Sequence, residues 1–84
     1  MRIAWTPTAW SEYIYWQSNN KKVFKKINDL ISDTVRNPKT GIGKPEALRY
    51  NLSGLWSRRI TQEHRLVYRI LEDEIRIIQC KYHY

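Results

Sequence analysis

The stretch LWSRRITQEHRLVYRI, residues 55–70, alternates between two kinds of side chain. Large, mostly apolar residues recur at every second position on both sides of a polar interruption at Gln62–His64. A period of two is typical of β-strands that bury one face, and a short polar interruption between two such runs is typical of a hairpin turn. We therefore predict two antiparallel strands joined by that turn.

The same period extends in both directions from this hairpin. Leu48–Leu52 alternates before a turn at Ser53–Gly54, and Ile75–Ile77 alternates after a turn at Glu72–Asp73. Glycine and acidic residues between apolar runs are typical turn signals. The sequence thus predicts a four-stranded antiparallel meander that begins at Leu48.

The N-terminal part carries helical signals instead. Arg2–Trp5 is short and mostly apolar and is interpreted as a strand, and Thr6–Pro7 then supplies an N-cap followed by proline at the first helical position. Apolar residues follow at spacings of three and four until Ser18–Asn20. The stripe expected to face the core consists of Trp10, Tyr13, Ile14 and Gln17.

A second helix is expected to begin after Asn20, which can act as its N-cap. It should end near Asn37–Pro38, because the residue before proline is disfavoured in helical conformation. Its core positions would be Val23, Ile27, Leu30, Ile31 and Val35.

This order of elements predicts an α+β fold in which two N-terminal helices pack on an antiparallel sheet. At 84 residues, we expect one domain, residues 1–84, with a thin core that a homodimer or a partner could help to stabilise. The connection Asn37–Ala47 is longer than usual for such a domain, and long loops are often functional.

Fifteen Lys and Arg residues against eight Asp and Glu give a net charge of +7, and the excess lies within residues 21–60. Such a balance favours a polyanionic partner. Four lysines at the start of the second predicted helix are either a solvated face or a phosphate-binding face, and the net charge favours the second; they are Lys21, Lys22, Lys25 and Lys26.

Cys80 is the only cysteine, so it cannot form an internal disulfide and is expected to be a small core residue. We expect an intracellular, cytoplasmic protein without a membrane segment. Nucleotide-loop, zinc-protease and hydrolase motifs are absent from the sequence, and we expect no metal and no cofactor.

The predicted sheet combines cations with aromatic rings, as RNA-binding surfaces do. Arg58, Arg59 and Arg65 are interleaved with Trp56 and Tyr68. A two-residue turn at Glu63–His64 would place Arg59 and Arg65 on opposite faces, whereas a longer turn would change that assignment.

Metal-independent RNA cleavage needs a base for the 2′-hydroxyl, cations for the phosphorane and an acid for the departing 5′-oxygen. Only His64 and His83 titrate near neutrality, and the acidic candidates are Glu46 and Glu63. Taken singly, a loop glutamate such as Glu46 is more often a solvated surface residue than a catalytic base. His64 is expected to be exposed in its turn.

Four segments together resemble a known family. They are GKPE (43–46), NLSGLWSRRIT (51–61), EHRLVY (63–68) and YHY (82–84). These segments are similar to those of the YoeB toxins, within the RelE/ParE superfamily of type II toxin–antitoxin systems, and the resemblance extends over the whole chain. It implies a RelE-like two-layer fold.

The resemblance also implies an endoribonuclease that cleaves mRNA in the A site of the 70S ribosome. Glu46 would be the general base, His83 the general acid and Arg65 the phosphorane-stabilising cation, with Tyr84 also in the site. Arg49, where relatives often carry lysine, and Arg59 would bind the RNA backbone. To this RNA-binding group we add Lys44, Arg58 and the four lysines of the second predicted helix.

The expected products are a 2′,3′-cyclic phosphate and a 5′-hydroxyl. The expected partner is an acidic YefM-like antitoxin. Two other classes remain open at this point: a non-catalytic ribosome- or RNA-binding inhibitor of translation, and a ParE-like toxin that acts on gyrase.

Overall fold

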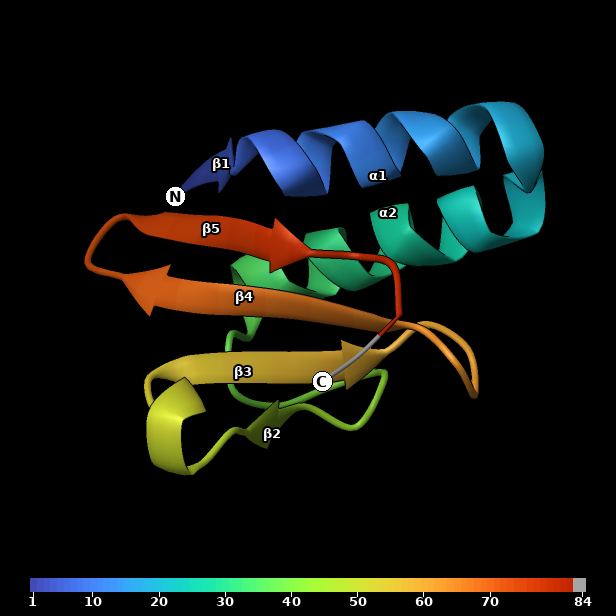
Figure 1. The fold of residues 1–84 in the computed structure, drawn as a ribbon. Coiled ribbons are helices and arrows are strands. Elements are labelled where there is room, and N and C mark those ends of the chain that lie inside the picture. The colour runs from blue at the N-terminus through green and yellow to red at the C-terminus, as the bar shows by residue number, and fades with distance from the viewer. Residues whose placement is uncertain (83–84) are drawn as a thin grey trace.

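The computed structural model describes residues 1–82, and Figure 1 shows their arrangement. In chain order the elements are β1 (Arg2–Trp5), α1 (Pro7–Asn19), α2 (Lys21–Arg36), β2 (Glu46–Ala47), a 3₁₀ turn (Tyr50–Leu52), β3 (Leu55–Arg59), β4 (Arg65–Leu71) and β5 (Glu74–Gln79). The strands form a five-stranded sheet in the order β1-β5-β4-β3-β2, and both helices pack on one of its faces. The predicted α+β two-layer fold is confirmed.

The sheet is mixed, because β1 lies parallel to β5. Arg2 is opposite Glu74 and Trp5 is opposite Ile77, whereas the other neighbouring strands are antiparallel. The prediction of a fully antiparallel sheet is therefore wrong at this edge. Between β1 and β5 the chain forms both helices and then β2, β3 and β4, and such a long connection permits parallel pairing.

Helix α2 has the boundaries and the buried face that the sequence predicts. The Asn20 side chain accepts a hydrogen bond from the Val23 amide at 3.1 Å, and the helix ends at Arg36. Four of the five expected core residues are buried, and Val35 packs against the core while partly exposed.

The predicted buried stripe of α1 is wrong except for Tyr13, which packs against the core while partly exposed. Ala9 and Trp16 are the buried residues of this helix, whereas the side chains of Trp10 and Ile14 are 49% and 40% exposed. Ala9 and Trp16 are seven residues apart, so they lie on the same face of the helix about two turns from each other. Trp10 instead packs at the rim, with its ring centroid 5.5 Å from that of Trp5.

The prediction of a strand over Leu48–Leu52 is wrong. Tyr50 has a φ of 58°, which a strand cannot accommodate, and it begins a 3₁₀ turn. The amide of Leu48 donates to the carbonyl of Leu55 at 2.9 Å, so the whole segment between them is a wide connection. The strand that pairs with β3 is the shorter β2, two residues earlier.

Cys80 is buried, as predicted, and packs in the core. Burial, followed by the negative charge of Glu12, raises the pKa of its thiol to about 12. The thiol therefore stays protonated and is a poor nucleophile. Neither helix in the described part of the chain has the length and apolar character required to cross a membrane.

Truncation of two apolar helix residues distinguishes the observed core from the stripe expected on α1. Leu30→Ala removes a fully buried side chain and should lower the free energy of unfolding by about 2–5 kcal/mol. Ile14→Ala, on the exposed face of α1, should change it by less than about 1 kcal/mol. Urea unfolding of both variants measures the difference, and equal losses would contradict this description of the core.

Candidate functional site

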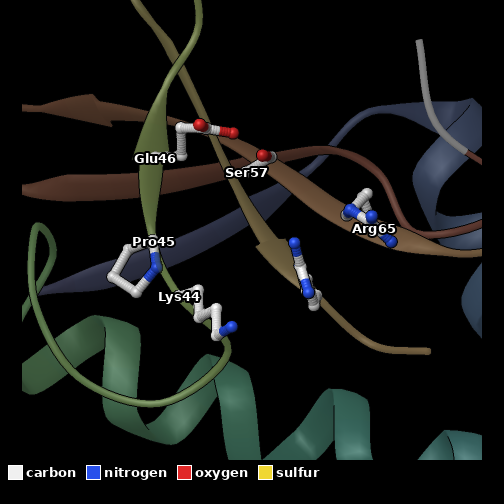
Figure 2. A pocket seen from close by; sticks show the side chains of 6 residues that line it. Lys44, Pro45, Glu46, Ser57 and Arg65 are labelled. Carbon is white, nitrogen blue, oxygen red and sulfur yellow. The ribbon is translucent and has the colours of Figure 1, made fainter. Parts of the chain in front are cut away.

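A polar pocket of about 280 Å³ lies where the end of the long loop crosses β3 and β4 (Figure 2). Its lining comes from the loop and β2, from β3 and from β4; the residues are Lys44, Pro45, Glu46, Ser57, Arg59 and Arg65. The pocket therefore combines one carboxylate with three cations from segments that are distant in the sequence.

Strand register explains why these side chains share a face. Glu46 is opposite Ser57, and Arg59 is directly opposite Arg65. Side chains alternate between the faces of a sheet, so Arg58 lies on the other face, toward the helices. The pocket consequently lies on the face that no helix covers.

The direct pairing of Arg59 with Arg65 follows from a connection of five residues, 60–64, between the strands. The two-residue turn considered from the sequence, which would separate these arginines, is wrong. Like charges directly opposite each other on neighbouring strands repel. An anion between or above the two guanidinium groups would relieve that repulsion.

The Arg65 guanidinium is held by carbonyl groups of this connection. Its Nη1 donates to the carbonyls of Thr61 at 2.8 Å and Gln62 at 3.0 Å. These contacts orient the side chain without neutralising it, because carbonyl oxygens carry no net charge. Arg65 is therefore an oriented cation beside the pocket.

Glu46 is exposed at the edge of the sheet on β2. Within residues 1–82 its carboxylate forms no ion pair with the neighbouring arginines. Figure 2 shows it projecting beside Ser57, with Arg65 further along the same face. An unpaired carboxylate next to cations can accept a proton from a ligand that the cations bind.

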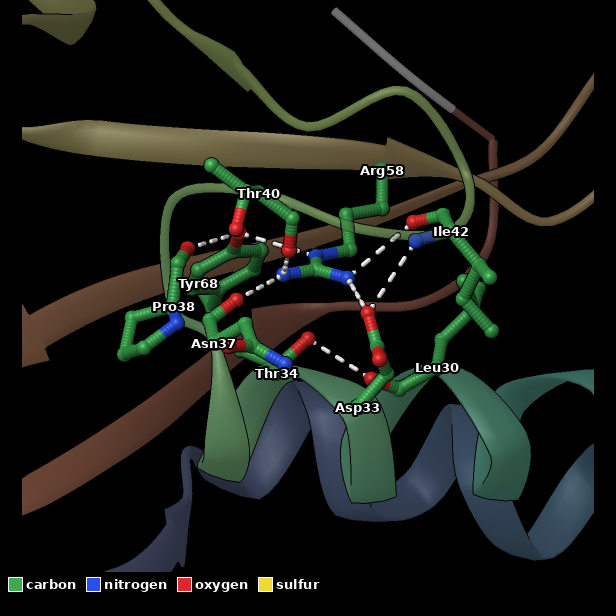
Figure 3. Close-up of polar contacts among 9 residues, drawn as sticks. All are labelled: Leu30, Asp33, Thr34, Asn37, Pro38, Thr40, Ile42, Arg58 and Tyr68. Atoms are coloured by element: carbon green, nitrogen blue, oxygen red, sulfur yellow. Dashed lines mark hydrogen bonds and ion pairs between the residues drawn. The ribbon is translucent and has the colours of Figure 1, made fainter.

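The loop that leads to Glu46 is fixed by Arg58, whose side chain is completely buried (Figure 3). Its guanidinium donates to the Asp33 carboxylate at 2.6 Å and to the carbonyls of Asn37, Thr40 and Ile42. The side chain lies inside the protein, so the sequence-based expectation that Arg58 contacts RNA is corrected.

Tyr68 completes this buried cluster. Its hydroxyl accepts from Arg58 Nε at 3.1 Å and donates to the Pro38 carbonyl at 2.7 Å. Tyr68 is fully buried, so its ring is also unavailable for stacking on bases. Desolvation raises the pKa of its phenol, although the Arg58 hydrogen bond and charge oppose this effect.

A tight turn at Gly43–Lys44 directs the loop into β2. Both residues have positive φ, 78° and 52°, and the Gly43 carbonyl accepts from the Arg59 amide at 2.7 Å. A Cβ on Gly43 would lie 2.6 Å from Leu30 Cδ2. Glycine is therefore needed here for its backbone conformation and for its small size.

The other expected RNA-binding residues lie outside the pocket. Arg49 is exposed and precedes the 3₁₀ turn. Lys22 and Lys26 line a second hollow of about 540 Å³ together with Ile60 and Thr61, which follow Arg59 directly in the sequence. Lys21 and Lys25 are exposed on α2 without lining that hollow, and Lys25 pairs with Asp29 at 3.0 Å.

Further outcomes concern His64, the last two residues of the chain and Ser57. His64 is buried instead of exposed, with its ring against that of Trp16. His83 and Tyr84, expected in the site, lie outside the described residues. Ser57 was missed by the sequence reasoning, although its position two residues before Arg59 on the same strand could have placed it on the shared face.

In the part of the chain that the structure describes, no group of three or more His, Cys, Asp and Glu side chains is arranged to hold a metal ion. The lining of the pocket itself supplies one carboxylate and three cations.

Comparison with known proteins agrees with this arrangement. Residues 5–84 match the family model described as the YoeB-like toxin of bacterial type II toxin–antitoxin systems. The chain is 55% identical to Toxin YoeB of Escherichia coli over 84 residues, which is the full length of both proteins. It is 54% identical to Toxin YoeB of Synechocystis, and this match covers 100% of the chain and 98% of the relative.

Solved structures give the same result. A YoeB/ParE toxin from Agrobacterium tumefaciens has a TM-score of 0.97 and 45% identity, with all of both chains covered. A YoeB dimer from Staphylococcus aureus has a TM-score of 0.93 and 50% identity, and a YoeB–YefM complex from that organism has a TM-score of 0.92 and 52% identity; each covers 100% of this chain and 98% of the other. The chain has the fold of the RelE-type toxins. It belongs to the YoeB-like family of type II toxins.

The Arg58–Asp33 ion pair gives stability a defined pH dependence. The Arg58 hydrogen bond, the first of several causes, lowers the pKa of the Asp33 carboxyl below its ordinary value of 3.8. A carboxyl with a depressed folded-state pKa stabilises the fold above its unfolded-state pKa, and this stabilisation disappears as the pH falls through the folded-state value. Urea midpoints of the wild type should therefore fall as the pH drops below about 4.

Asp33→Asn should be less stable than the wild type at neutral pH and should lose less stability over that acidic range. Asp29→Asn, at the exposed pair with Lys25, is the matched control and should behave like the wild type. An unchanged pH dependence in Asp33→Asn would contradict this role of the ion pair.

Gly43→Ala should disturb the approach of the loop to β3 for two reasons. The new methyl group meets Leu30, and the backbone at this position has a positive φ that alanine disfavours. We expect a loss of about 1–3 kcal/mol in the free energy of unfolding. Gly54→Ala is the comparison variant: it shares positive φ but meets only the flexible end of Arg69, so it should lose less. Equal losses would show that the contact with Leu30 has no effect.

Proposed function

We propose that this chain is the toxin of a type II toxin–antitoxin system and acts as a ribosome-dependent mRNA endoribonuclease in the cytoplasm, with residues 1–84 as one functional domain. The observation that carries the proposal is the convergence of Glu46, Arg59 and Arg65 on one uncovered pocket. Membership of a family of toxins that are generally ribonucleases supports it.

In the proposed reaction the Glu46 carboxylate takes the proton of an RNA 2′-hydroxyl. The 2′-oxygen then bonds to the adjacent phosphorus, and the bond from phosphorus to the 5′-oxygen breaks. Arg65, with Arg59 beside it, stabilises the charge of the five-coordinate phosphorane. His83 protonates the departing 5′-oxygen, and Tyr84 contributes to the same site.

The products would be a 2′,3′-cyclic phosphate and a 5′-hydroxyl. Arg49, Lys44 and the lysines of α2 would contact RNA phosphates. Lys22, which is exposed, and Lys26, which is partly exposed, lie beside the hollow next to Ile60–Thr61 and provide positive charge on α2. We expect the charge to favour docking in the A site of the 70S ribosome.

The proposed partner outside the ribosome is a YefM-like antitoxin. The Staphylococcus aureus relative has been solved both as a YoeB–YefM complex and as a YoeB dimer. We extend both possibilities to this chain. An acidic antitoxin segment that enters the pocket would compete with RNA for Arg59 and Arg65.

Glu46→Gln tests the proposed base. Removal of the carboxylate while the side-chain size is retained should lower the rate of cleavage on programmed ribosomes by about 100- to 10,000-fold. Primer extension on the ribosome-bound message detects the new 5′ ends. Binding of the variant to ribosomes, measured by co-sedimentation, should remain close to that of the wild type.

The matched control is Glu72→Gln, because Glu72 is exposed in the turn after β4, at the opposite end of that strand from Arg65. It should cleave like the wild type. If Glu46→Gln cleaves normally, Glu46 is not the base. If the wild type inhibits translation without producing new 5′ ends, inhibition occurs by occlusion and the proposed enzyme is wrong.

A further inference from the structure

The segment Cys80–Tyr82 follows β5 without belonging to a strand, yet its backbone is held by specific side chains. The Cys80 amide donates to Glu12 Oε1 at 2.8 Å, and its carbonyl accepts from Trp16 Nε1 at 2.9 Å. The Lys81 carbonyl accepts from the side chain of Gln79 at 2.9 Å. Helix α1 and β5 thus fix the first part of this segment.

Tyr82 is held from the other side by two consecutive residues. Its amide donates to Nδ1 of His64 at 2.7 Å, and its carbonyl accepts from the Arg65 amide at 2.9 Å. Tyr82 has a φ of 61°, which is uncommon for a residue other than glycine and persists only where surrounding contacts enforce it. The two hydrogen bonds provide that enforcement.

His64 is suited to hold a fixed position. Its ring is buried, with its centroid 4.8 Å from that of Trp16, and Thr61 Oγ1 accepts from its amide at 3.1 Å. Because Nδ1 accepts a hydrogen bond, the ring must be neutral, with its proton on Nε2. Nε2 lies 3.8 Å from Glu63 Oε1.

The hydrogen bond from Tyr82 therefore depends on one ring nitrogen in one protonation state. A packing residue alone would not need this nitrogen, because an apolar side chain of similar size could contact Trp16 equally well. The adjacent residue, Arg65, contacts the same Tyr82 peptide through its backbone and contributes its guanidinium to the pocket. The segment Cys80–Tyr82 and the pocket are thus held in a fixed relative position by His64 and Arg65.

We propose that His64 is a positioning residue for the segment Cys80–Tyr82: its neutral Nδ1 holds the Tyr82 amide and so keeps this segment beside Arg65. His83 follows Tyr82 directly in the sequence. The inference rests on the proposed function, because His83 is the acid of that reaction.

Two variants separate the hydrogen bond from packing. His64→Leu fills space without an acceptor, whereas His64→Asn retains an oxygen that can take the place of Nδ1. In His64→Leu, hydrogen exchange of the Tyr82 amide, measured by NMR, should accelerate by about tenfold, which corresponds to the net contribution of one hydrogen bond. His64→Asn should recover part of this protection.

Cleavage on programmed ribosomes should show the same order. In His64→Leu, kcat should fall by up to about 100-fold, as expected when a reacting group is displaced by about 1 Å, while KM stays near that of the wild type. His64→Asn should regain part of the lost kcat. Nitrogen chemical shifts of the His64 ring in the wild type should show Nδ1 without a proton.

Wild-type protection of Tyr82 and wild-type kcat in His64→Leu would overturn the inference. So would equal loss in both variants accompanied by equal loss of thermal stability, since that outcome indicates packing alone. If the wild type itself produces no cleavage, the proposed function fails and the catalytic part of this inference fails with it. Loss of kcat in His64→Leu beside a cleaving wild type supports it.

Discussion

A single buried cation, the guanidinium of Arg58, holds together the parts of this molecule that form the pocket. It connects β3 to α2 through Asp33, to the long loop through three carbonyl groups and to β4 through Tyr68. A buried charge is tolerated only when its partners are complete, and removal of one partner is costly. The loop therefore has one conformation that satisfies this cation, and that conformation delivers Glu46 to the edge of the sheet.

The elements that the sequence predicted well are those governed by local chemistry. Asn20 caps α2 through its own side chain, and the spacing of Ile27, Leu30 and Ile31 identifies the buried face, because both signals lie within a few residues of their effect. The alternation around Trp56 and Tyr68 similarly predicted β3 and β4. Glu46 and Arg65 were selected by a general requirement of RNA cleavage and by resemblance, and the structure brings them to one pocket.

The errors concern properties that tertiary contacts decide. Arg58 and His64 were assigned to the surface because polar side chains usually lie there. Their hydrogen-bond partners, a cluster of carbonyls and a backbone amide, are many residues away in the sequence, so no local signal reveals them. The facing of Arg59 and Arg65 depended on the length of one connection, since a shift of one residue reverses every side chain in a strand. In α1, the spacing of the exposed Trp10 and Ile14 resembled a core stripe, whereas the small Ala9 marked a true contact.

The parallel pairing of β1 with β5 has a consequence for synthesis of the protein. The partner of Arg2 is Glu74, so the first strand has no neighbour until β5 has been translated. The buried residues Ile75 and Ile77 arrive at the same late moment, and without them the helices lack part of the surface on which they pack. A nascent chain of this kind cannot join β1 to the other strands until β5 is available. For a chain proposed to act on ribosomes, the order of its strands postpones the complete sheet until β5 has been translated.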